Sequence, residues 1–228
     1  MGFDRPGDRA ARSWRRRHGT SLPARLLRAW RTRRLVSALR LGSQSCVLDV
    51  GCGTGEQLAE LAHIVHRGIG IDCAPGMIRE ARAHLSRSAP TRLEYRVCAI
   101  EDASAQELGT FDGVLFIGSL EHMADPALAL ARAAQLLRPD GRIAVFMPHP
   151  RHPRALLHRL QARFGRMPPF RHLTARQLAT VAATAGLRRL PSSPGERLHN
   201  LLSLIVPGSY LVVLVADPTI RAALTTTP

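Results

Sequence analysis

The sequence predicts an α/β fold: a doubly wound, mostly parallel sheet of seven strands with a helical arm at its N-terminus. From position 46 onward, short apolar runs alternate with helical patterns of roughly 10 to 15 residues, which is the pattern of right-handed βαβ units. The run FDGVLFI at 111–117 shows no polar alternation, as is typical of a strand covered on both faces. We therefore expect one sheet with helices on both sides.

An arginine-rich arm, residues 1–42, precedes the main domain, residues 43–228. Pro23 stands where a helix would begin, because its missing N–H needs no partner in the first turn. Leucines recur at helical spacing after that proline, with arginines on the other face. We expect Gly42 to end this helix.

The first part of the main domain consists of strands and helices in turn. In chain order we expect strands at 46–50, 68–72, 93–99 and 111–117, with helices at 56–66 and 75–85 between them. Pro75 and Pro126 each stand where a helix would begin. The next elements expected are a helix at 126–137, a turn at 139–141 and a fifth strand at 142–147.

The alternation stops after residue 148. Residues 149–172 are dense in proline, arginine and histidine, and we expect a lid insert there that covers a ligand pocket together with the apolar segment 198–208. That segment fits equally well as core beneath the last strand. A helix at 174–185, with Thr174 as its N-cap, and strands at 187–190 and 209–216 complete the predicted sheet.

The composition indicates a globular protein with a strongly basic arm. Hydrophobic residues make up 45% of the chain, and the net charge of +15 would by itself suggest a nucleic-acid partner. The sequence has no lysine, however, and residues 1–40 hold twelve arginines against two aspartates. Most of the excess charge therefore belongs to the arm and not to the main domain.

The spacing of the cysteines and the absence of a long apolar segment in the sequence favour a cytoplasmic location. None of the four cysteines has the C-x-x-C spacing of a zinc site, so we expect reduced thiols. The N-terminal residues form no apolar leader segment, so we expect no secretory signal. The apolar stretch at 201–216 contains a proline and a glycine and is shorter than a bilayer span.

A glycine-rich turn, GCGTG at 51–55, follows the first strand and precedes a helix. Glycines let a ligand approach the backbone, and the start of the next helix offers free N–H groups. Asp49 comes just before the turn, and Asp72 ends the second strand, where a carboxylate can accept both hydroxyls of a ribose. These two acids fit a nucleoside with a positively charged group and no phosphate.

Four stretches carry a family resemblance: VLDVGCGTG (47–55), GIGIDCAPGMIREAR (68–82), FDGVLFIGSLEHMADP (111–126) and AAQLLRPDGRIAVFMP (133–148). In this order they resemble the class I S-adenosylmethionine-dependent methyltransferases, which have a Rossmann-like fold. SLEHMADP and AIEDAS are most similar to the ubiquinone-biosynthesis O-methyltransferases and their small-molecule relatives. The resemblance implies a methyltransferase with S-adenosyl-L-methionine as its cofactor.

The resemblance also implies roles by position. Gly51 and Gly53 would contact the methionine part of the cofactor, and Asp49 would hold its ammonium group. Asp72 would bind the ribose. Arg31 lies at the offset before the glycine turn at which an arginine contacts the cofactor in the ubiquinone type.

Near the adenine, Glu101 and Asp102 are alternative partners for the amine, and Met77 would pack beside the ring. Ile117 would line the cofactor near the sulfonium. Met77 and Ile117 fit equally well as plain core residues. The complete predicted cofactor set is Arg31, Asp49, Gly51, Cys52, Gly53, Gly55, Asp72, Cys73, Met77, Ile100, Glu101 and Ile117.

Methyl transfer from a sulfonium needs positioning and, for an acceptor that holds its proton tightly, a base. The candidates are Glu121 and His122 after the fourth strand and His149 after the fifth. His122 fits equally well as a structural hydrogen-bonding residue. In the ubiquinone type a Glu-x-x-Glu-His cluster is associated with a divalent metal, but Gly118 replaces the first glutamate here, so we expect no metal.

These features predict S-adenosylmethionine-dependent O-methylation of a small, hydrophobic or aromatic metabolite in a biosynthetic step. One alternative is an RNA or protein methyltransferase guided by the arginine-rich arm, and another is a non-catalytic subunit that keeps the cofactor fold. The arm itself has three interpretations: a solvated helix over the cofactor, a phosphate-facing arm for RNA, or a basic helix on anionic lipid or an acidic carrier protein. Few aromatic residues lie among its arginines, which argues against base stacking on RNA.

Overall fold

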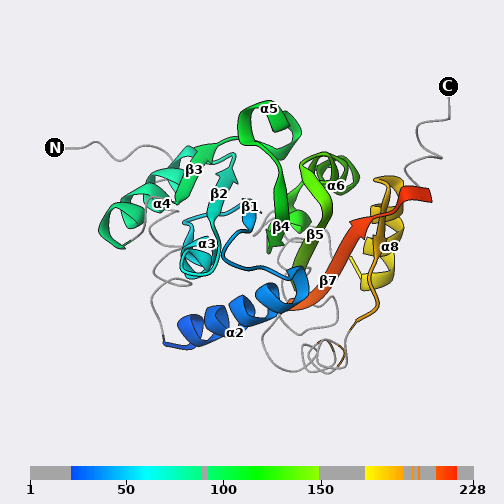
Figure 1. Ribbon diagram of the computed structural model, residues 1–228, viewed down its shortest axis with the longest axis horizontal. Coiled ribbons are helices and arrows are strands. Elements are labelled where there is room, and N and C mark those ends of the chain that lie inside the picture. Colours follow the sequence, from blue (N-terminus) through cyan, green and yellow to red (C-terminus); the bar gives the residue numbers. More distant parts are fainter. Residues whose placement is uncertain are drawn as a thin grey trace, which may run out of the picture. The chain divides into compact units, whose positions relative to one another are not determined.

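The computed structural model describes residues 22–88, 92–148, 173–192, 197, 200 and 209–219 of the 228-residue chain. Within them, seven strands form one sheet in the order β3-β2-β1-β4-β5-β7-β6 (Figure 1). The strands are β1 (Cys46–Val50), β2 (Arg67–Asp72), β3 (Leu93–Val97), β4 (Phe111–Ile117), β5 (Leu137–Pro148), β6 (Leu187–Arg189) and β7 (Ser209–Ala216). The predicted fold class is confirmed.

The strand order reverses between β1 and β4. Strand β1 pairs in parallel with β2, and β2 pairs in parallel with β3. The chain then returns to place β4 on the other side of β1. In doubly wound folds, ligands bind beyond the carboxyl ends of the strands at such a reversal, which is where the turn after β1 lies. Strand β7 is antiparallel to both β5 and β6, so the sheet is mostly parallel.

The chain divides into two compact units. The first comprises Met1–Leu115 and Leu136–Gly141, and the second comprises Phe116–Gln135 and Arg142–Pro228. Helices of the first unit are α2 (Leu22–Leu39), α3 (Glu56–Leu61), α4 (Pro75–Ser88), α5 (Ala105–Leu108) and the 3-10 turn η1 (Ile100–Asp102). Those of the second are η2 (Leu120–His122), α6 (Pro126–Gln135) and α8 (Ala175–Thr184). The expected division into an arm and a main domain stays a prediction.

Strands β1 and β2 provide the centre of the core of the first unit. Every residue of β1 is buried, and Leu48, Ile69 and Ile71 have no exposed surface. Fully burying one such side chain stabilises the fold by about 1.5–3 kcal/mol. Helix α4 packs against β2 and β3, and α3 packs against β2 and α2 (Figure 1).

Helix α2 ends at Leu39, three residues before the expected stop at Gly42, so that prediction is wrong. Arg40 takes the left-handed conformation at the helix end, with φ of 56°. The N–H of Arg40 donates to Ser37 O at 3.3 Å, and the N–H of Leu41 donates to Val36 O at 2.9 Å. These two bonds form a Schellman motif, which satisfies the last carbonyls without a glycine.

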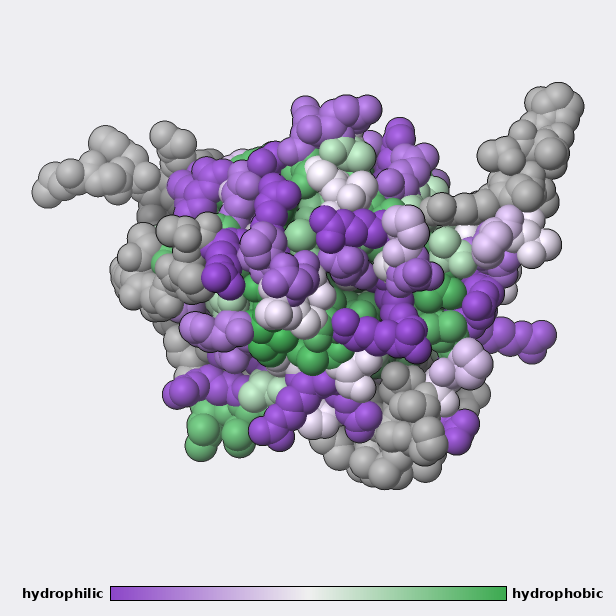
Figure 2. Space-filling model, viewed as in Figure 1, coloured by the Kyte–Doolittle hydropathy of each residue, from purple (hydrophilic) through white to green (hydrophobic). Residues whose placement is uncertain are grey.

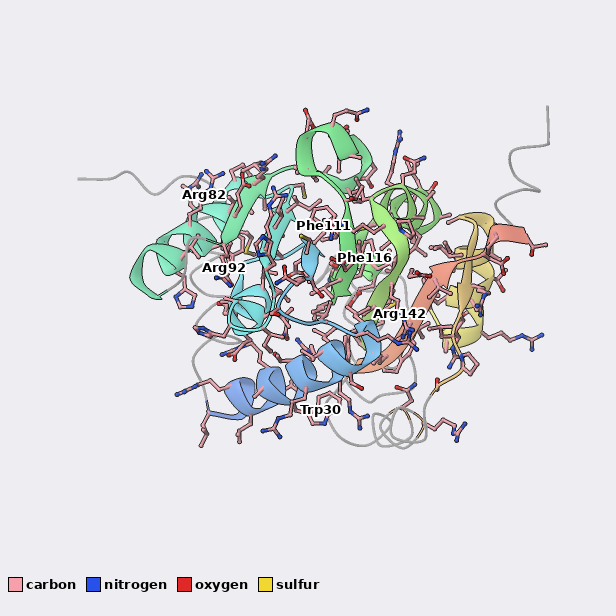
Figure 3. The ribbon with its side chains drawn as sticks, in the orientation of Figure 1. Trp30, Arg82, Arg92, Phe111, Phe116 and Arg142 are labelled. Carbon is pink, nitrogen blue, oxygen red and sulfur yellow. The ribbon has the colours of Figure 1, made fainter. Side chains whose placement is uncertain are left out.

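The start of α2 exposes apolar side chains. Leu22 is 66% exposed and Leu26 is 63% exposed. Figure 2 shows an apolar patch where this helix begins, next to hydrophilic residues. Further along, the guanidinium of Arg34 lies 5.5 Å from the centre of the Trp30 ring, which is labelled in Figure 3. No helix among the described residues combines the length and the apolar character that a membrane span requires.

Helix α3 stops at Leu61, and the predicted continuation to residue 66 is wrong. A turn follows, in which the N–H groups of Ile64 and Val65 both donate to Leu61 O. Leu61 and Val65 are buried in the core all the same. A tight turn that keeps its side chains facing inward has the apolar spacing of a helix, so the periodicity did not distinguish the two.

Strand β5 begins at Leu137, whereas a turn was expected at 139–141. The local turn chemistry is present, because Asp140 has a positive φ of 63°. The strand continues through it because Asp112 of β4 anchors Arg138 with an Arg138 Nη1 to Asp112 Oδ2 distance of 2.8 Å. Asp112 Oδ2 also accepts the N–H of Cys46 at 2.7 Å. Tertiary contacts thus extend pairing across a residue that would otherwise end the strand.

In the second unit, β5 pairs with β7 from Arg142 to Pro148, and β6 pairs with the far end of β7. Helix α8 packs against β6 and α6. Thr174 caps α8 as predicted: its hydroxyl accepts the N–H of Gln177 at 3.2 Å, and Gln177 Oε1 accepts the N–H of Thr174 at 2.8 Å. Such a capping box stabilises a helix start by about 1 kcal/mol.

Candidate functional site

The glycine turn after β1 lies against the end of β2. The N–H groups of Gly51 and Cys52 donate to Ile71 O at 2.8 and 3.0 Å. Gly51, Gly53 and Gly55 all have positive φ, between 55° and 80°, a conformation that L side chains rarely adopt. A Cβ on Gly53 would have no atom of the described residues within 4 Å, so none of their side chains fills the space at the centre of the turn. A ligand can approach the backbone there.

Asp72 joins the ends of β1 and β2. Its Oδ2 accepts the N–H of Gly53 at 3.0 Å, and its Oδ1 accepts the N–H of Ala74 at 2.8 Å. The carboxylate is half-buried and turned toward the glycine turn. Each carboxylate oxygen can accept a second hydrogen bond, so the group is oriented and still able to bind two hydroxyls.

Asp49 is the buried acid of the site. It is 2% exposed and ends the apolar part of β1. Burial and, next to it, the nearby carboxylate of Asp72 raise the pKa of Asp49 to about 7, and the charge of Arg31 opposes this shift. Such a group costs free energy when ionised alone and is stabilised by a cation. The site therefore favours a ligand with a positive charge.

Helix α2 contributes Arg31 to the same region. Arg31 Nη1 donates to Gln57 Oε1 at 3.4 Å, and Gln57 Nε2 donates to Thr32 Oγ1 at 2.8 Å. Gln57 and Thr32 are buried, so this polar network holds α2 against α3. Burial lowers the pKa of Arg31 to about 10, and attraction to Asp49 opposes that effect. The structure thus brings together two predicted residues from distant parts of the sequence.

Tyr95 of β3 supports the turn, a role that was not predicted from the sequence. Its hydroxyl donates to Gly55 O at 2.9 Å. Its ring occupies the space where a Cβ on Gly55 or on Gly70 would lie, at 2.6 Å in both cases. From α4, Arg82 donates two hydrogen bonds to Tyr95 O, at 2.9 and 2.6 Å; Arg82 is labelled in Figure 3. The one available signal of the contact between Tyr95 and Gly70 is the position of Tyr95 in the middle of the strand LEYRV, which pairs with Gly70 of β2.

The residues predicted near the adenine lie on two neighbouring segments of the first unit. Cys73 is exposed and Met77 is half-buried at the start of α4. On η1, Ile100 is buried and Glu101 is half-buried. The N–H of Cys98 donates to the backbone oxygen of Asp72 at 3.1 Å, which keeps the end of β3 beside the end of β2.

The remaining predicted residues belong to the second unit. Ile117 is half-buried at the end of β4. Glu121 is buried on η2, whereas its neighbour His122 is exposed. His149 and the expected lid at 149–172 lie outside the described residues. In the part of the chain that is described, no three His, Cys, Asp or Glu side chains lie close enough together to hold a metal ion.

A doubly wound sheet with a glycine turn after β1 and acids at the ends of β1 and β2 is the arrangement of class I S-adenosylmethionine-dependent methyltransferases. Residues 48–145 match the family model described as a methyltransferase domain. This part of the chain is a class I methyltransferase domain, the class that uses S-adenosyl-L-methionine as its cofactor.

Among curated proteins, the chain is similar to ubiquinone biosynthesis O-methyltransferases. It is 38% identical over 97 residues to that of Xanthomonas axonopodis pv. citri, which covers 42% of this chain and 40% of the relative. It is 34% identical over 133 residues to that of Xanthomonas euvesicatoria pv. vesicatoria, covering 58% and 55%. The chain thus matches about half the length of these relatives or less.

Solved structures share the fold at low identity. One is a chain of a structure described as the complex between the Haloferax volcanii Trm112 methyltransferase activator and "the putative methyltransferase", with a TM-score of 0.66 and 19% identity over 95% of this chain and 100% of that one. Another is magnesium protoporphyrin IX methyltransferase from Synechocystis PCC 6803 with bound S-adenosylhomocysteine, with a TM-score of 0.63 and 16% identity over 92% and 95%. The [4+2]-cyclase SpnF also matches, with a TM-score of 0.59, 17% identity, and coverage of 82% and 79%. These likenesses establish the fold alone.

Proposed function

We propose that the protein transfers the methyl group of S-adenosyl-L-methionine to a small-molecule acceptor. The observation that carries this proposal is the bond between the Asp72 carboxylate and the N–H of Gly53, beside the buried carboxyl of Asp49. A buried acid next to the turn would repel the pyrophosphate of a dinucleotide and attract a cationic nucleoside. The methyl donor is such a nucleoside.

The residues present fit this cofactor. Asp72 would accept the ribose hydroxyls, and the backbone at Gly51 and Gly53 would contact the amino-acid part. Asp49 would stabilise the ammonium group, directly or through water, and Arg31 would attract the carboxylate. On the adenine side we place Cys73, Met77, Ile100 and Glu101.

The main requirement that methyl transfer places on the protein is to position the acceptor atom. When bound, the cofactor supplies a methyl group activated by a positively charged sulfur. The chain must hold an acceptor atom in line with that methyl group at about 3–3.5 Å, and such positioning can supply roughly 7–11 kcal/mol of the barrier. A proton acceptor is needed in addition only where the acceptor atom carries a tightly held proton.

For the acceptor, we propose the hydroxyl group of a hydrophobic or aromatic metabolite. The matched curated relatives are named as O-methyltransferases of ubiquinone biosynthesis, which supports a hydroxyl over an amine or carbon acceptor. The predicted pocket segments, 149–172 and 198–208, lie for the most part outside the described residues, so the support comes from the relatives.

Two measurements test this function separately. Calorimetry with S-adenosylhomocysteine should show binding to the full-length protein, and a Gly53→Val variant should lose it because the side chain fills the open face of the turn. A panel of phenols, catechols and amines with methyl-labelled cofactor should show transfer to hydroxyl acceptors. Absence of cofactor binding would refute the function as a whole, and transfer only to RNA or protein would refute the acceptor class.

For the basic arm, we propose contact between α2 and an anionic lipid surface. The exposed side chains of Leu22 and Leu26 would insert among lipids, and the exposed arginines Arg25 and Arg33 would pair with headgroup charges. Helix α2 contains no acidic residue that would oppose this contact. The exposed leucines favour a lipid surface over RNA, which offers no apolar phase.

A further inference from the structure

Two cysteines lie next to one another where β2 and β3 end. In the parallel register of these strands Asp72 pairs with Val97, so the residues that follow, Cys73 and Cys98, are also neighbours. The N–H of Cys98 donates to Asp72 O at 3.1 Å, which holds the two segments together at this point. Neighbouring strands lie about 4.7–4.9 Å apart, within the Cα separation of about 4.4–6.8 Å that a disulfide bond spans.

The register directs both thiols to the same face of the sheet. Side chains alternate between the two faces along a strand, and opposite residues of paired strands share a face. Gly70 and Tyr95 are such a pair, and each cysteine lies three positions further along its strand, which corresponds to the other face. Cys52 lies on the Gly70 side, because its Sγ is 2.8 Å from the position of a Cβ on Gly70. Cys73 is therefore paired with Cys98 and not with Cys52.

The two thiols differ in their access to solvent. Cys73 is exposed, whereas Cys98 is half-buried and its Sγ–H donates to Ala99 O at 3.1 Å. Burial and, after it, the charges of Asp102 and Glu107 raise the pKa of the Cys98 thiol. The thiolate is the form that attacks an oxidant, and the oxidant must reach it. Cys73 is thus the thiol that meets a dissolved oxidant first, and Cys98 is the neighbour that reacts second.

We infer that Cys73 and Cys98 are a reversible oxidation site, and that their disulfide closes the adenine side of the cofactor site. For the place of the adenine, this inference rests on the proposed function. The oxidant is a peroxide, which reacts with an exposed thiolate to give a sulfenic acid that a neighbouring thiol converts to a disulfide.

The reaction with hydrogen peroxide has two steps. In the first, the Cys73 thiolate attacks one peroxide oxygen: the S–O bond forms, the O–O bond breaks, and the departing hydroxide takes up a proton to become water. In the second, the Cys98 thiolate attacks the sulfur of the sulfenic acid: the S–S bond forms, the S–O bond breaks, and a second hydroxide leaves as water. Two thiols and one peroxide give one disulfide and two waters, so the two sulfurs lose two electrons in total and the peroxide gains them.

The disulfide and the adenine would compete for Cys73. In the proposed function the adenine lies beside Cys73 and η1, and η1 begins at Ile100, two residues after Cys98. A disulfide draws the Cys73 sulfur toward Cys98 and joins the two segments that the adenine must separate. Oxidation should therefore weaken the binding of S-adenosylhomocysteine roughly 10- to 100-fold, and by linkage the bound molecule should favour the thiols.

The first test maps the disulfides of the full-length wild type. The protein is exposed to hydrogen peroxide, its remaining thiols are blocked with iodoacetamide, and its tryptic peptides are analysed by mass spectrometry without reduction. Cleavage after arginine places Cys73 in 68–79, Cys98 in 97–132 and the other two cysteines in 41–67. Peptides 68–79 and 97–132 should be joined, and dithiothreitol should separate them. Sulfinic acid at Cys73 without a disulfide, or a disulfide to 41–67, would overturn the inference.

The second test measures the effect on S-adenosylhomocysteine binding by calorimetry. Cys98→Ser keeps the size of the side chain but cannot form the disulfide, and Cys46→Ser, buried at the start of β1, is the matched control. Both reduced variants should bind with wild-type affinity. After peroxide, the wild type and Cys46→Ser should lose affinity roughly 10- to 100-fold and regain it with dithiothreitol, whereas Cys98→Ser should keep it. An equal loss in Cys98→Ser would show that the disulfide is not the cause.

The wild type alone provides a further check, and the outcomes separate the inference from the function. Saturation with S-adenosylhomocysteine should slow the joining of the two peptides, and an unchanged rate would contradict closure of the site. If the reduced wild type failed to bind S-adenosylhomocysteine, the proposed function would fall, while the mapping would still decide whether the disulfide forms. Normal binding by the fully disulfide-bonded protein would refute only the inference.

Discussion

The Asp72 carboxylate accepts the backbone N–H of Gly53 at 3.0 Å across nineteen residues of sequence. This bond fixes the orientation of the carboxylate before any ligand arrives, and a second bond from the N–H of Ala74 at 2.8 Å supports it. A preorganised acceptor loses less entropy on binding than a mobile one. The glycine turn and the acid therefore act as one rigid element at the ends of β1 and β2.

Asp72→Asn should weaken the binding of S-adenosylhomocysteine by roughly 10- to 100-fold, because hydrogen bonds to a charged group contribute about 1.5–3 kcal/mol. Calorimetry measures the change. Asp140→Asn is the matched control, since Asp140 is exposed and asparagine accepts its positive φ. Equal affinity in Asp72→Asn and the wild type would show that this carboxylate does not hold the ribose.

Asp49 should make the protein less stable as pH rises between about 4 and 7. Its folded pKa of about 7 exceeds the ordinary value of an unfolded aspartate, about 3.9, so the folded state binds more protons in this range. Stability is then highest below the unfolded pKa and falls until the pH passes the folded pKa. Melting temperatures of the wild type and Asp49→Asn should diverge across this interval, with the variant the more stable at pH 8. Parallel melting curves at all pH values would contradict the raised pKa.

Gly70→Ala should destabilise the protein by about 1–3 kcal/mol, the usual cost of overpacking a core. The added methyl group would lie 2.6 Å from the Tyr95 ring and 2.8 Å from Cys52 Sγ. Gly42→Ala is the control, because a Cβ there has no atom within 4 Å in the described part of the chain. Denaturant unfolding measures both. A loss of stability no larger in Gly70→Ala than in Gly42→Ala would mean that Tyr95 does not fill this space.

Cys73 should react faster with iodoacetamide than the other described cysteines, and the cofactor should protect it. Cys73 is exposed, Cys46 is buried, and burial together with the charges of Asp49 and Asp72 raises the pKa of the Cys52 thiol. Saturation with S-adenosylhomocysteine should slow alkylation of Cys73 by about tenfold or more if the adenine lies beside it. Mass spectrometry follows each site, and an unchanged rate would place the adenine elsewhere.

Replacing Leu22 and Leu26 by serine should reduce binding to phosphatidylglycerol vesicles, since burying one leucine contributes about 1.5–3 kcal/mol. Leu128→Ser is the matched control, because Leu128 is also exposed, at 41%, but lies on α6. Sedimentation with phosphatidylglycerol and with phosphatidylcholine vesicles measures the effect. Equal binding to both lipids, or salt-dependent binding to RNA that needs neither leucine, would refute the lipid proposal.

The order of strands and helices could be predicted from the sequence because apolar runs and turn residues are local signals. The ends of elements could not, since distant contacts decide them. Arg40 ends α2 where a glycine was expected, and the anchoring of Arg138 by Asp112 carries β5 through Asp140. The role of Tyr95 depends on the absence of side chains at Gly55 and Gly70, which are far from it in sequence.

The class of fold and the kind of ligand are local properties of the sequence: an acid before a glycine turn and an acid at the end of the next strand favour a cationic nucleoside when the two strands are parallel. Which of these side chains are buried depends on the tertiary structure. Glu121 and His122 are adjacent in the sequence, yet one is buried and the other is exposed. Burial raises the pKa values of Asp49 and Glu121, and for Asp49 the charge of Asp72 adds to this effect; burial depends on segments that meet only in the folded chain.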